Sequence, residues 1–176
     1  MNNNDILIRL RYALDIKDVE MIEIFKLGGV SITKDDLQRM LLNQKNSRKS
    51  DSKDDGFIAD ENMKKCNNYM LDSFLNGFII LKRGKQESNS NVTENKVQSF
   101  NEKSIMNNVM LKKVKIALSL TSEEVIEILN IAGINISKGE LSAVLRREGQ
   151  RNYRECGDRY ARNFLKGLAM RYRKSN

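Results

Sequence analysis

The sequence contains no histidine, no tryptophan and only two cysteines among its 176 residues. Without histidine there is no imidazole general base, no histidine-based catalytic triad and no histidine metal ligand. Cys66 and Cys156 are too few for a zinc cluster of their own, and we expect two free, partly buried thiols. No glycine-rich phosphate loop is present either. The sequence therefore predicts no catalytic residue, no metal site and no cofactor, and favours a binding module over an enzyme.

Long apolar runs are also absent. No stretch approaches the ~20 apolar residues that would span a bilayer. The first residues, MNNNDILIRLRYAL, lack the basic start and the small-residue cleavage site of a signal peptide. With 40% hydrophobic and 31% charged residues, the composition is typical of a folded chain. We expect a cytoplasmic protein without a membrane partner.

What the chain does contain is an internal repeat. Residues 4–42 align without gaps on residues 108–146, and 13 of the 39 aligned positions are identical. The similarity resumes at residues 66–83, which align on residues 156–173. The offset falls from 104 to 90 between the two alignments, so the first copy carries 14 extra residues. We predict a first repeat at 1–84 with a polar loop at 43–65, a polar linker at 85–104 and a second repeat at 105–176.

Each copy contains four helical patterns, and no segment alternates polar and apolar residues long enough to predict a strand. Thr33 and Ser137 stand three residues before an acidic side chain, as N-caps do. Gly29 and Gly133 follow the second helix of each copy and suit left-handed C-terminal caps. Short helical units bury little surface alone. The sequence thus predicts an all-α protein of two tandem repeats, about four helices each, packed with pseudo-two-fold symmetry.

The chain resembles a known family through three segments. The second half contains NISKGELSAVLRREGQRNYRECGDRYARNFLKGL, and the first contains NNDILIRLRYALDI and FLNGFIILKRGK. These segments are similar to the two repeats of the YehS-like proteins, which are uncharacterised bacterial proteins made of two copies of a domain of unknown function. The resemblance covers nearly the whole chain and departs at the loop 43–65, which is longer and more polar. It implies the duplication and the helical fold, and it supplies no activity or ligand.

The net charge of +8 is concentrated at the end of the chain. Residues 146–176 hold ten of the 31 basic residues and three of the 23 acidic ones, which leaves 21 basic and 20 acidic residues elsewhere. Eight of the ten are arginine, which favours forked contacts with phosphate. Such segregation produces a local positive field that attracts polyanions.

The last helical pattern carries an apolar stripe and, beside it, a basic stripe. The basic stripe consists of Arg159, Arg162, Lys166 and Arg173. At the equivalent positions the first repeat has Tyr69, Asp72, Asn76 and Arg83. The fold therefore does not require most of this charge. Exposed arginine and lysine are nevertheless common on helices without a ligand, so a binding face and a merely solvated face both stay open.

Tyrosines accompany these cations, as a surface that stacks on single-stranded bases requires. Of these tyrosines, Tyr172 falls on the apolar stripe and is expected in the core. We predict binding of nucleic acid, with RNA or single-stranded DNA ahead of duplex DNA. The predicted contact residues are Arg146, Arg147, Arg151, Tyr153, Arg154, Arg159, Arg162, Lys166 and Arg173. The alternative is a protein–protein adaptor whose basic face docks an acidic protein partner; the oligomeric state is left open.

Two further patterns are weaker. The second and third helical patterns of each copy have the rhythm of a helix-turn-helix, with Lys138, Ser142, Arg146 and Arg147 as DNA contacts in the second copy. Any two short helices joined by a glycine-containing turn produce the same rhythm. The segment DSKDDG at 51–56 is a poor match to a calcium loop and predicts a solvated loop. Glutamate pairs early in the second helices suit the helix dipole rather than catalysis.

Overall fold

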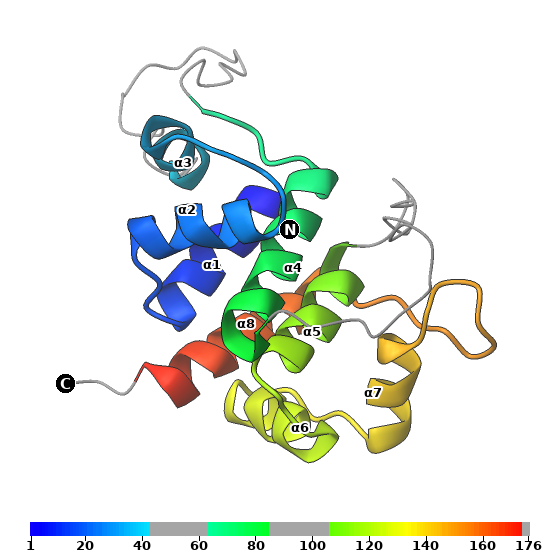
Figure 1. The fold of residues 1–176 in the computed structure, drawn as a ribbon. Helices are drawn as coiled ribbons and strands as arrows, with labels where there is room; N and C mark the ends of the chain where they lie inside the picture. The colour runs from blue at the N-terminus through cyan, green and yellow to red at the C-terminus, as the bar shows by residue number, and fades with distance from the viewer. Residues whose placement is uncertain (43–62, 85–105, 174–176) are drawn as a thin grey trace, which may run out of the picture.

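The computed structural model describes residues 1–42, 63–84 and 106–173. The predicted linker 85–104, the segment DSKDDG and most of the predicted polar loop 43–65 lie outside these ranges. The described residues form α-helices and no strand, so the all-α prediction is confirmed. The helices of the first repeat are α1 (Asn3–Ala13), α2 (Asp18–Leu27), α3 (Lys34–Leu41) and α4 (Asn68–Arg83) (Figure 1). Those of the second are α5 (Met106–Ala117), α6 (Ser122–Ile131), α7 (Lys138–Leu145) and α8 (Asp158–Tyr172).

Local signals set the helix ends as predicted. The Thr33 hydroxyl accepts a hydrogen bond from the Asp36 N–H at the start of α3, and Ser137 forms a reciprocal capping box at the start of α7. Gly29 and Gly133 have φ angles of 90° and 88°, the left-handed conformation that ends α2 and α6. The same capping chemistry therefore recurs in the two repeats.

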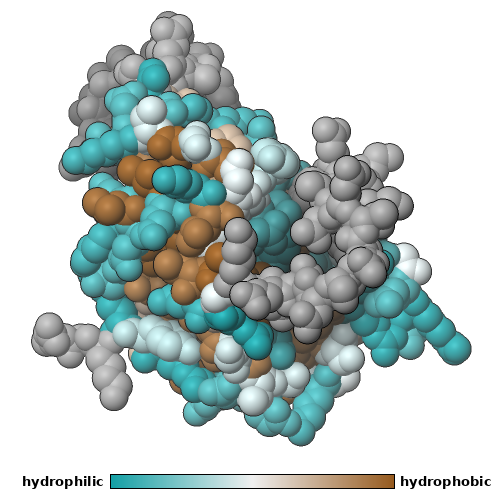
Figure 2. All heavy atoms as spheres, in the orientation of Figure 1, coloured by the Kyte–Doolittle hydropathy of each residue, from teal (hydrophilic) through white to brown (hydrophobic). Residues whose placement is uncertain are grey.

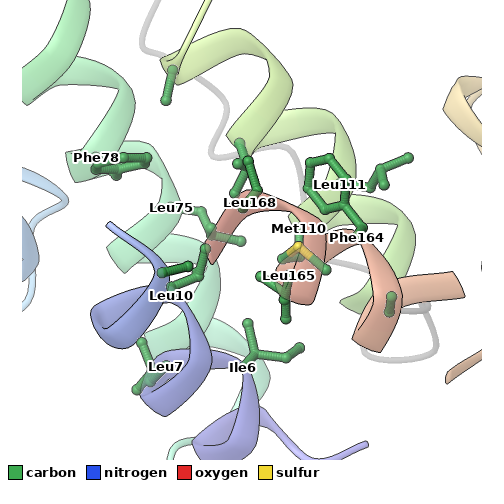
Figure 3. Close-up of a cluster of buried hydrophobic side chains, with 14 of the residues drawn as sticks. Ile6, Leu7, Leu10, Leu75, Phe78, Met110, Leu111, Phe164, Leu165 and Leu168 are labelled. Atoms are coloured by element: carbon green, nitrogen blue, oxygen red, sulfur yellow. The ribbon is translucent and has the colours of Figure 1, made fainter. Parts of the chain in front are cut away.

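The two repeats share one hydrophobic core. Within each repeat, α2 packs on α4 and α6 packs on α8; between the repeats, α4 packs on α5 and α1 packs on α8. Figure 3 shows side chains of α1, α4, α5 and α8 meeting at the centre. They include Ile6, Leu7 and Leu10 of α1, Leu75 and Phe78 of α4, Met110 and Leu111 of α5, and Phe164, Leu165 and Leu168 of α8. Neither repeat could bury these residues alone, because each contributes only half of the central helices.

Paired contacts between the repeats confirm the pseudo-two-fold packing. At the α4–α5 interface, the Arg83 guanidinium donates a hydrogen bond to the Ile116 carbonyl oxygen at 3.4 Å. At the α1–α8 interface, Arg173 donates to the Tyr12 carbonyl oxygen at 3.2 Å. Arg173 is the repeat equivalent of Arg83, and Ile116 is the equivalent of Tyr12. The two interfaces therefore have the same helix register.

Glycines let the helices within each repeat approach closely. A Cβ atom added at Gly77 of α4 would lie 1.8 Å from the Ile24 carbonyl oxygen of α2. The equivalent glycine of α8, Gly167, would place its Cβ 2.0 Å from the Ile128 carbonyl oxygen of α6. Any side chain at either position would force the helices apart.

A buried asparagine near the start of α1 and of α5 holds the segment that leads into the fourth helix. Each side chain donates two hydrogen bonds to carbonyl oxygens and accepts one from the N–H of a cysteine. The partners of Asn4 are Met40, Lys64 and Cys66, and those of Asn108 are Val144, Arg154 and Cys156. Both cysteines are buried free thiols, as expected. Burial raises the pKa of Cys66 to about 12 and that of Cys156 to about 11.

The prediction for Tyr172 was wrong. Its side chain is 44% exposed, although it falls on the apolar stripe of α8. Tyr172 is the last residue of the helix, and Figure 1 shows this end of α8 extending towards the C-terminus beyond the centre of the molecule. A helical stripe is buried only where another element covers it, and the last turn of α8 is not covered on this side. No helix in the described ranges is long and apolar enough to cross a membrane.

Candidate nucleic-acid interface

The outward face of α8 carries three basic side chains. Arg159, Arg162 and Lys166 are all exposed, while the apolar side chains of α8 point into the shared core. Residues three and four apart lie on one face of a helix, so the three cations form a continuous row. We call Arg159, Arg162 and Lys166 the α8 basic row.

Among the described residues, little negative charge lies against the α8 basic row. The side chains of Arg159 and Lys166 form no ion pair with any residue that the structure describes. Arg162 lies 3.8 Å from an oxygen of Asp158, which is longer than a hydrogen bond. Asp158 is itself bound by the Met1 ammonium and by the Asn107 amide at 2.9 Å, and these hydrogen bonds lower the pKa of its carboxyl group. The row therefore keeps donors free for a ligand.

The basic residues of the α7–α8 connection are more engaged. Arg154 pairs with Glu140 at 3.2 Å, and the Arg146 side chain donates to the Arg151 carbonyl oxygen. The side chains of Arg147 and Arg151 form no ion pair within the described part of the chain. Figure 1 shows this connection extending beside α7, away from the body of α8. The structure therefore divides the predicted cations into two groups rather than one surface.

Tyr153, the predicted stacking residue of this connection, is partly buried. Burial raises the pKa of its hydroxyl, and nearby carboxylates add to the effect. Its ring is therefore only partly available to a base. Exposed tyrosines lie elsewhere, at Tyr12 of α1, Tyr69 of α4 and Tyr172 of α8.

Arg173 does not belong to the α8 basic row in space. It lies about 20 Å along the helix from Arg159. Its guanidinium carbon is 4.0 Å from the centre of the Tyr12 ring, and it also donates to the Tyr12 carbonyl oxygen. Arg173 thus joins the two repeats. The sequence contained a signal for this role, because Arg173 alone in the basic stripe has a basic counterpart, Arg83, which makes the equivalent contact.

The helix-turn-helix residues are placed less favourably than predicted. Lys138 forms an ion pair with Glu123 at 2.6 Å, while Ser142 is exposed on α7. Helix α7 ends at Leu145, so Arg146 and Arg147 follow the helix instead of lying on it. Of the four predicted contacts, Lys138 and Ser142 lie on α7. Since Lys138 is paired with Glu123, Ser142 is the one of these two that forms no ion pair among the described residues.

Two basic residues that the sequence analysis did not single out contribute to this region. Arg171 of α8 pairs with Glu124 at 2.8 Å and with Glu127 at 3.2 Å, both on α6. Glu124 and Glu127, the glutamate pair early in the second helix of the second repeat, therefore have a structural role. Arg9 is exposed on α1, the helix that packs against α8, and it forms no ion pair among the described residues. Comparing Arg9 with its repeat equivalent, Lys113, would have drawn attention to it.

Within the described ranges, no cluster of three or more cysteine, aspartate or glutamate residues could hold a metal ion. Every buried side-chain nitrogen or oxygen in these ranges has a hydrogen-bond partner. The described interior therefore presents no unpaired polar group toward which a ligand could be directed, and the exposed cations are the chemically distinctive feature.

Comparison with known proteins gives two matches. The family model described as "Protein of unknown function (DUF1456)" matches residues 3–84 and 107–174. The "Uncharacterized protein YehS" of Escherichia coli (strain K12) is 36% identical over 171 residues, which cover 97% of this chain and 96% of the relative. No solved structure matches the chain.

Proposed function

The chain belongs to the DUF1456 family of proteins of unknown function, and we propose that it is a non-enzymatic cytoplasmic module that binds nucleic acid. The ligand is RNA or single-stranded DNA ahead of duplex DNA. The strand would contact two separate groups of cations, the α8 basic row and the pair Arg147 and Arg151 of the α7–α8 connection. The observation that carries the proposal is the contrast between the fourth helices of the two repeats. Their buried faces are alike, yet the positions of the α8 basic row, all exposed and cationic, are occupied on α4 by Tyr69, Asp72 and Asn76.

Unpaired cations on a folded surface suit a phosphate backbone. Each phosphate contact releases condensed counterions, so binding is strong at low salt and weakens as salt increases. Arginine presents a planar fork of donors that matches phosphate oxygens. Arg159 and Lys166 have no ion pair within the described ranges, so binding a phosphate would break no existing ion pair there.

Single strands are favoured by the exposed aromatic rings and by the short α7. Tyr172 and Tyr12 are exposed at the C-terminal end of α8, each with an arginine guanidinium beside its ring. Such rings stack on unpaired bases. Helix α7 has eight residues and its Lys138 is already paired, which gives duplex DNA little to contact in its major groove.

The proposal is tested by fluorescence anisotropy with single-stranded RNA, single-stranded DNA and duplex DNA over a series of salt concentrations. The test variant is Arg159→Glu/Arg162→Glu/Lys166→Glu. The control variant, Lys26→Glu/Lys34→Glu/Lys65→Glu, makes the same change in net charge at exposed lysines of the first repeat. We expect the wild type and the control to bind single strands. The test variant should bind at least ~10-fold more weakly, with the slope of log K against log salt reduced by about 2.

Two results would contradict the proposal. Equal losses in the test and control variants would mean that binding follows net charge alone. Absence of binding to every nucleic acid at low salt would remove the proposed function. Recovery from nuclease-treated lysate of one acidic protein, lost in the test variant only, would then assign the surface to the alternative adaptor function.

A further inference from the structure

The α4–α5 interface contains a neutralised cation. The Lys113 ammonium of α5 lies 2.5 Å from a carboxylate oxygen of Asp72 and 2.6 Å from the amide oxygen of Asn76, both on α4. Lys113 and Asp72 are each only about one-fifth exposed. The Lys113–Asp72 ion pair therefore joins the first repeat to the second.

The α1–α8 interface has cations at all three equivalent positions. The repeat equivalent of Lys113 is Arg9 on α1, and those of Asp72 and Asn76 are Arg162 and Lys166 on α8. The two interfaces have the same register, because Arg83 and Arg173 make equivalent contacts across them. By this equivalence we expect Arg9 to lie opposite Arg162 and Lys166, as Lys113 lies opposite Asp72 and Asn76.

The described part of the chain supplies little negative charge to Arg9, Arg162 and Lys166. Asp5, one turn before Arg9 on α1, forms no ion pair with Arg9 or with the α8 cations among the described residues. Asp158 is 3.8 Å from Arg162 and is held by Met1 and Asn107. Like charges at adjoining positions repel, so the interface is less favourable as it stands than its α4–α5 counterpart. An anion bound among the three cations would remove that repulsion.

We propose that Arg9, Arg162 and Lys166 form a phosphate-binding site that spans the two repeats. Two guanidinium forks and one ammonium offer several donors to the oxygens of one tetrahedral phosphate group. For the source of that phosphate the inference rests on the proposed function, which makes it a phosphodiester of the bound strand. The site adds a residue of the first repeat to a surface otherwise built from the second.

The test uses two variants and one control in the full-length chain. Arg9→Gln removes the α1 cation and keeps a polar side chain. Arg162→Asp/Lys166→Asn gives α8 the residues that α4 uses to neutralise Lys113. Lys26→Gln removes an exposed cation of the first repeat away from this interface. For each protein, the midpoint of thermal unfolding is measured in inorganic phosphate and in sodium chloride at equal ionic strength, and single-stranded RNA binding is measured by anisotropy.

We expect phosphate to raise the unfolding midpoint of the wild type and of Lys26→Gln by about 3 °C relative to chloride. This rise should be absent in Arg9→Gln and in the Arg162→Asp/Lys166→Asn variant. Arg9→Gln should also bind single-stranded RNA about tenfold more weakly than the wild type. If the α8 double variant does not fold, Arg9→Gln alone decides the result.

The outcomes separate this site from the proposed function. A wild type that phosphate does not stabilise, or a rise that Arg9→Gln retains, would overturn the site. RNA binding that is lost in Arg159→Glu/Arg162→Glu/Lys166→Glu but unchanged in Arg9→Gln would also overturn the site. The proposed function would then stand. A phosphate effect that depends on Arg9 without any binding of RNA or DNA would support the site and overturn the proposed function, leaving a small phosphorylated molecule as the ligand.

Discussion

The fourth helix occurs twice in this protein, and its two copies share one face and differ on the other. In α4 and α8 the buried residues include a phenylalanine, a leucine and a glycine at equivalent positions, Phe74 with Phe164, Leu75 with Leu165 and Gly77 with Gly167. At the α4–α5 interface, Asp72 and Asn76 of α4 bind Lys113, whereas the equivalent positions of α8 hold Arg162 and Lys166. The comparison separates what the fold needs from what the fold leaves free.

A second contrast concerns the surface of α2 and α4 in the first repeat and the equivalent surface of α6 and α8 in the second. Figure 2 shows apolar side chains gathered over α2 and the neighbouring part of α4. Val19 of α2 is 77% exposed, while its equivalent on α6, Glu123, pairs with Lys138. Leu81 of α4 is likewise replaced on α8 by Arg171, which pairs with Glu124 and Glu127. One repeat thus presents an apolar surface where the other presents ion pairs.

The largest effect should come from the glycines that both repeats share. Gly77→Ala and Gly167→Ala each place a Cβ within about 2 Å of a backbone oxygen, and we expect each to destabilise the protein by ~3 kcal/mol or more in urea unfolding. Gly28 makes an equally close approach to α4, but its repeat equivalent is Ala132. The control Ala132→Gly should therefore cost about 1 kcal/mol at most. If Gly77→Ala destabilised the protein only slightly, α2 and α4 could move apart without a large loss of stability.

The buried asparagines should behave as equals. Asn4→Ala and Asn108→Ala each remove a side chain that makes three hydrogen bonds to the backbone. Unpaired buried polar groups are costly, so we expect each substitution to lower the free energy of unfolding by ~3 kcal/mol. The exposed Asn130→Ala is the control and should change it by less than about 0.5 kcal/mol. A large difference between the two variants in chemical denaturation would contradict the equivalence of the repeats.

Exchanging Arg171 for its first-repeat equivalent should have a smaller effect. Arg171→Leu removes the ion pairs to Glu124 and Glu127, which are partly exposed and therefore weak. We expect a slight fall in the urea midpoint at low salt and no difference from the wild type in 1 M sodium chloride, where exposed ion pairs are screened. A loss that persists in high salt would show that packing of the arginine stem, rather than its charge, stabilises α8 on α6.

The smallest effect concerns the two thiols. Burial raises the pKa of Cys66 from 9.0 to about 12 and that of Cys156 from 9.0 to about 11. The folded state therefore favours the protonated thiols, and their contribution to stability is complete below pH 9 and is lost as pH rises towards 11 or 12. In urea unfolding, the wild type should lose stability above pH 9 more steeply than Cys66→Ala/Cys156→Ala. Rapid alkylation of either thiol in the folded protein at pH 8 would contradict their burial.

The sequence predicted the helices well, and it predicted the exposure of some of the proposed contact residues. Caps such as Ser137 and left-handed glycines such as Gly133 act within a few residues, so their effect could be inferred directly. The exposure of Arg159, Arg162 and Lys166 followed from the helical period of α8. The pairing of Arg154 with Glu140 and the stacking of Arg173 on Tyr12 could not be inferred. Those contacts depend on how separate helices pack.

By itself, the sequence determined that the protein is all-α and duplicated, because helix periodicity, capping and the repeat are properties of short segments read along the chain. Only the tertiary structure decided which helices of the two repeats meet, and hence which charges are neutralised. Packing α5 on α4 gives Lys113 a carboxylate, whereas packing α1 on α8 gives Arg9 no ion pair among the described residues. The physical reason is that an ion pair requires two side chains to come within about 4 Å, and the fold alone determines that distance for residues far apart in the chain.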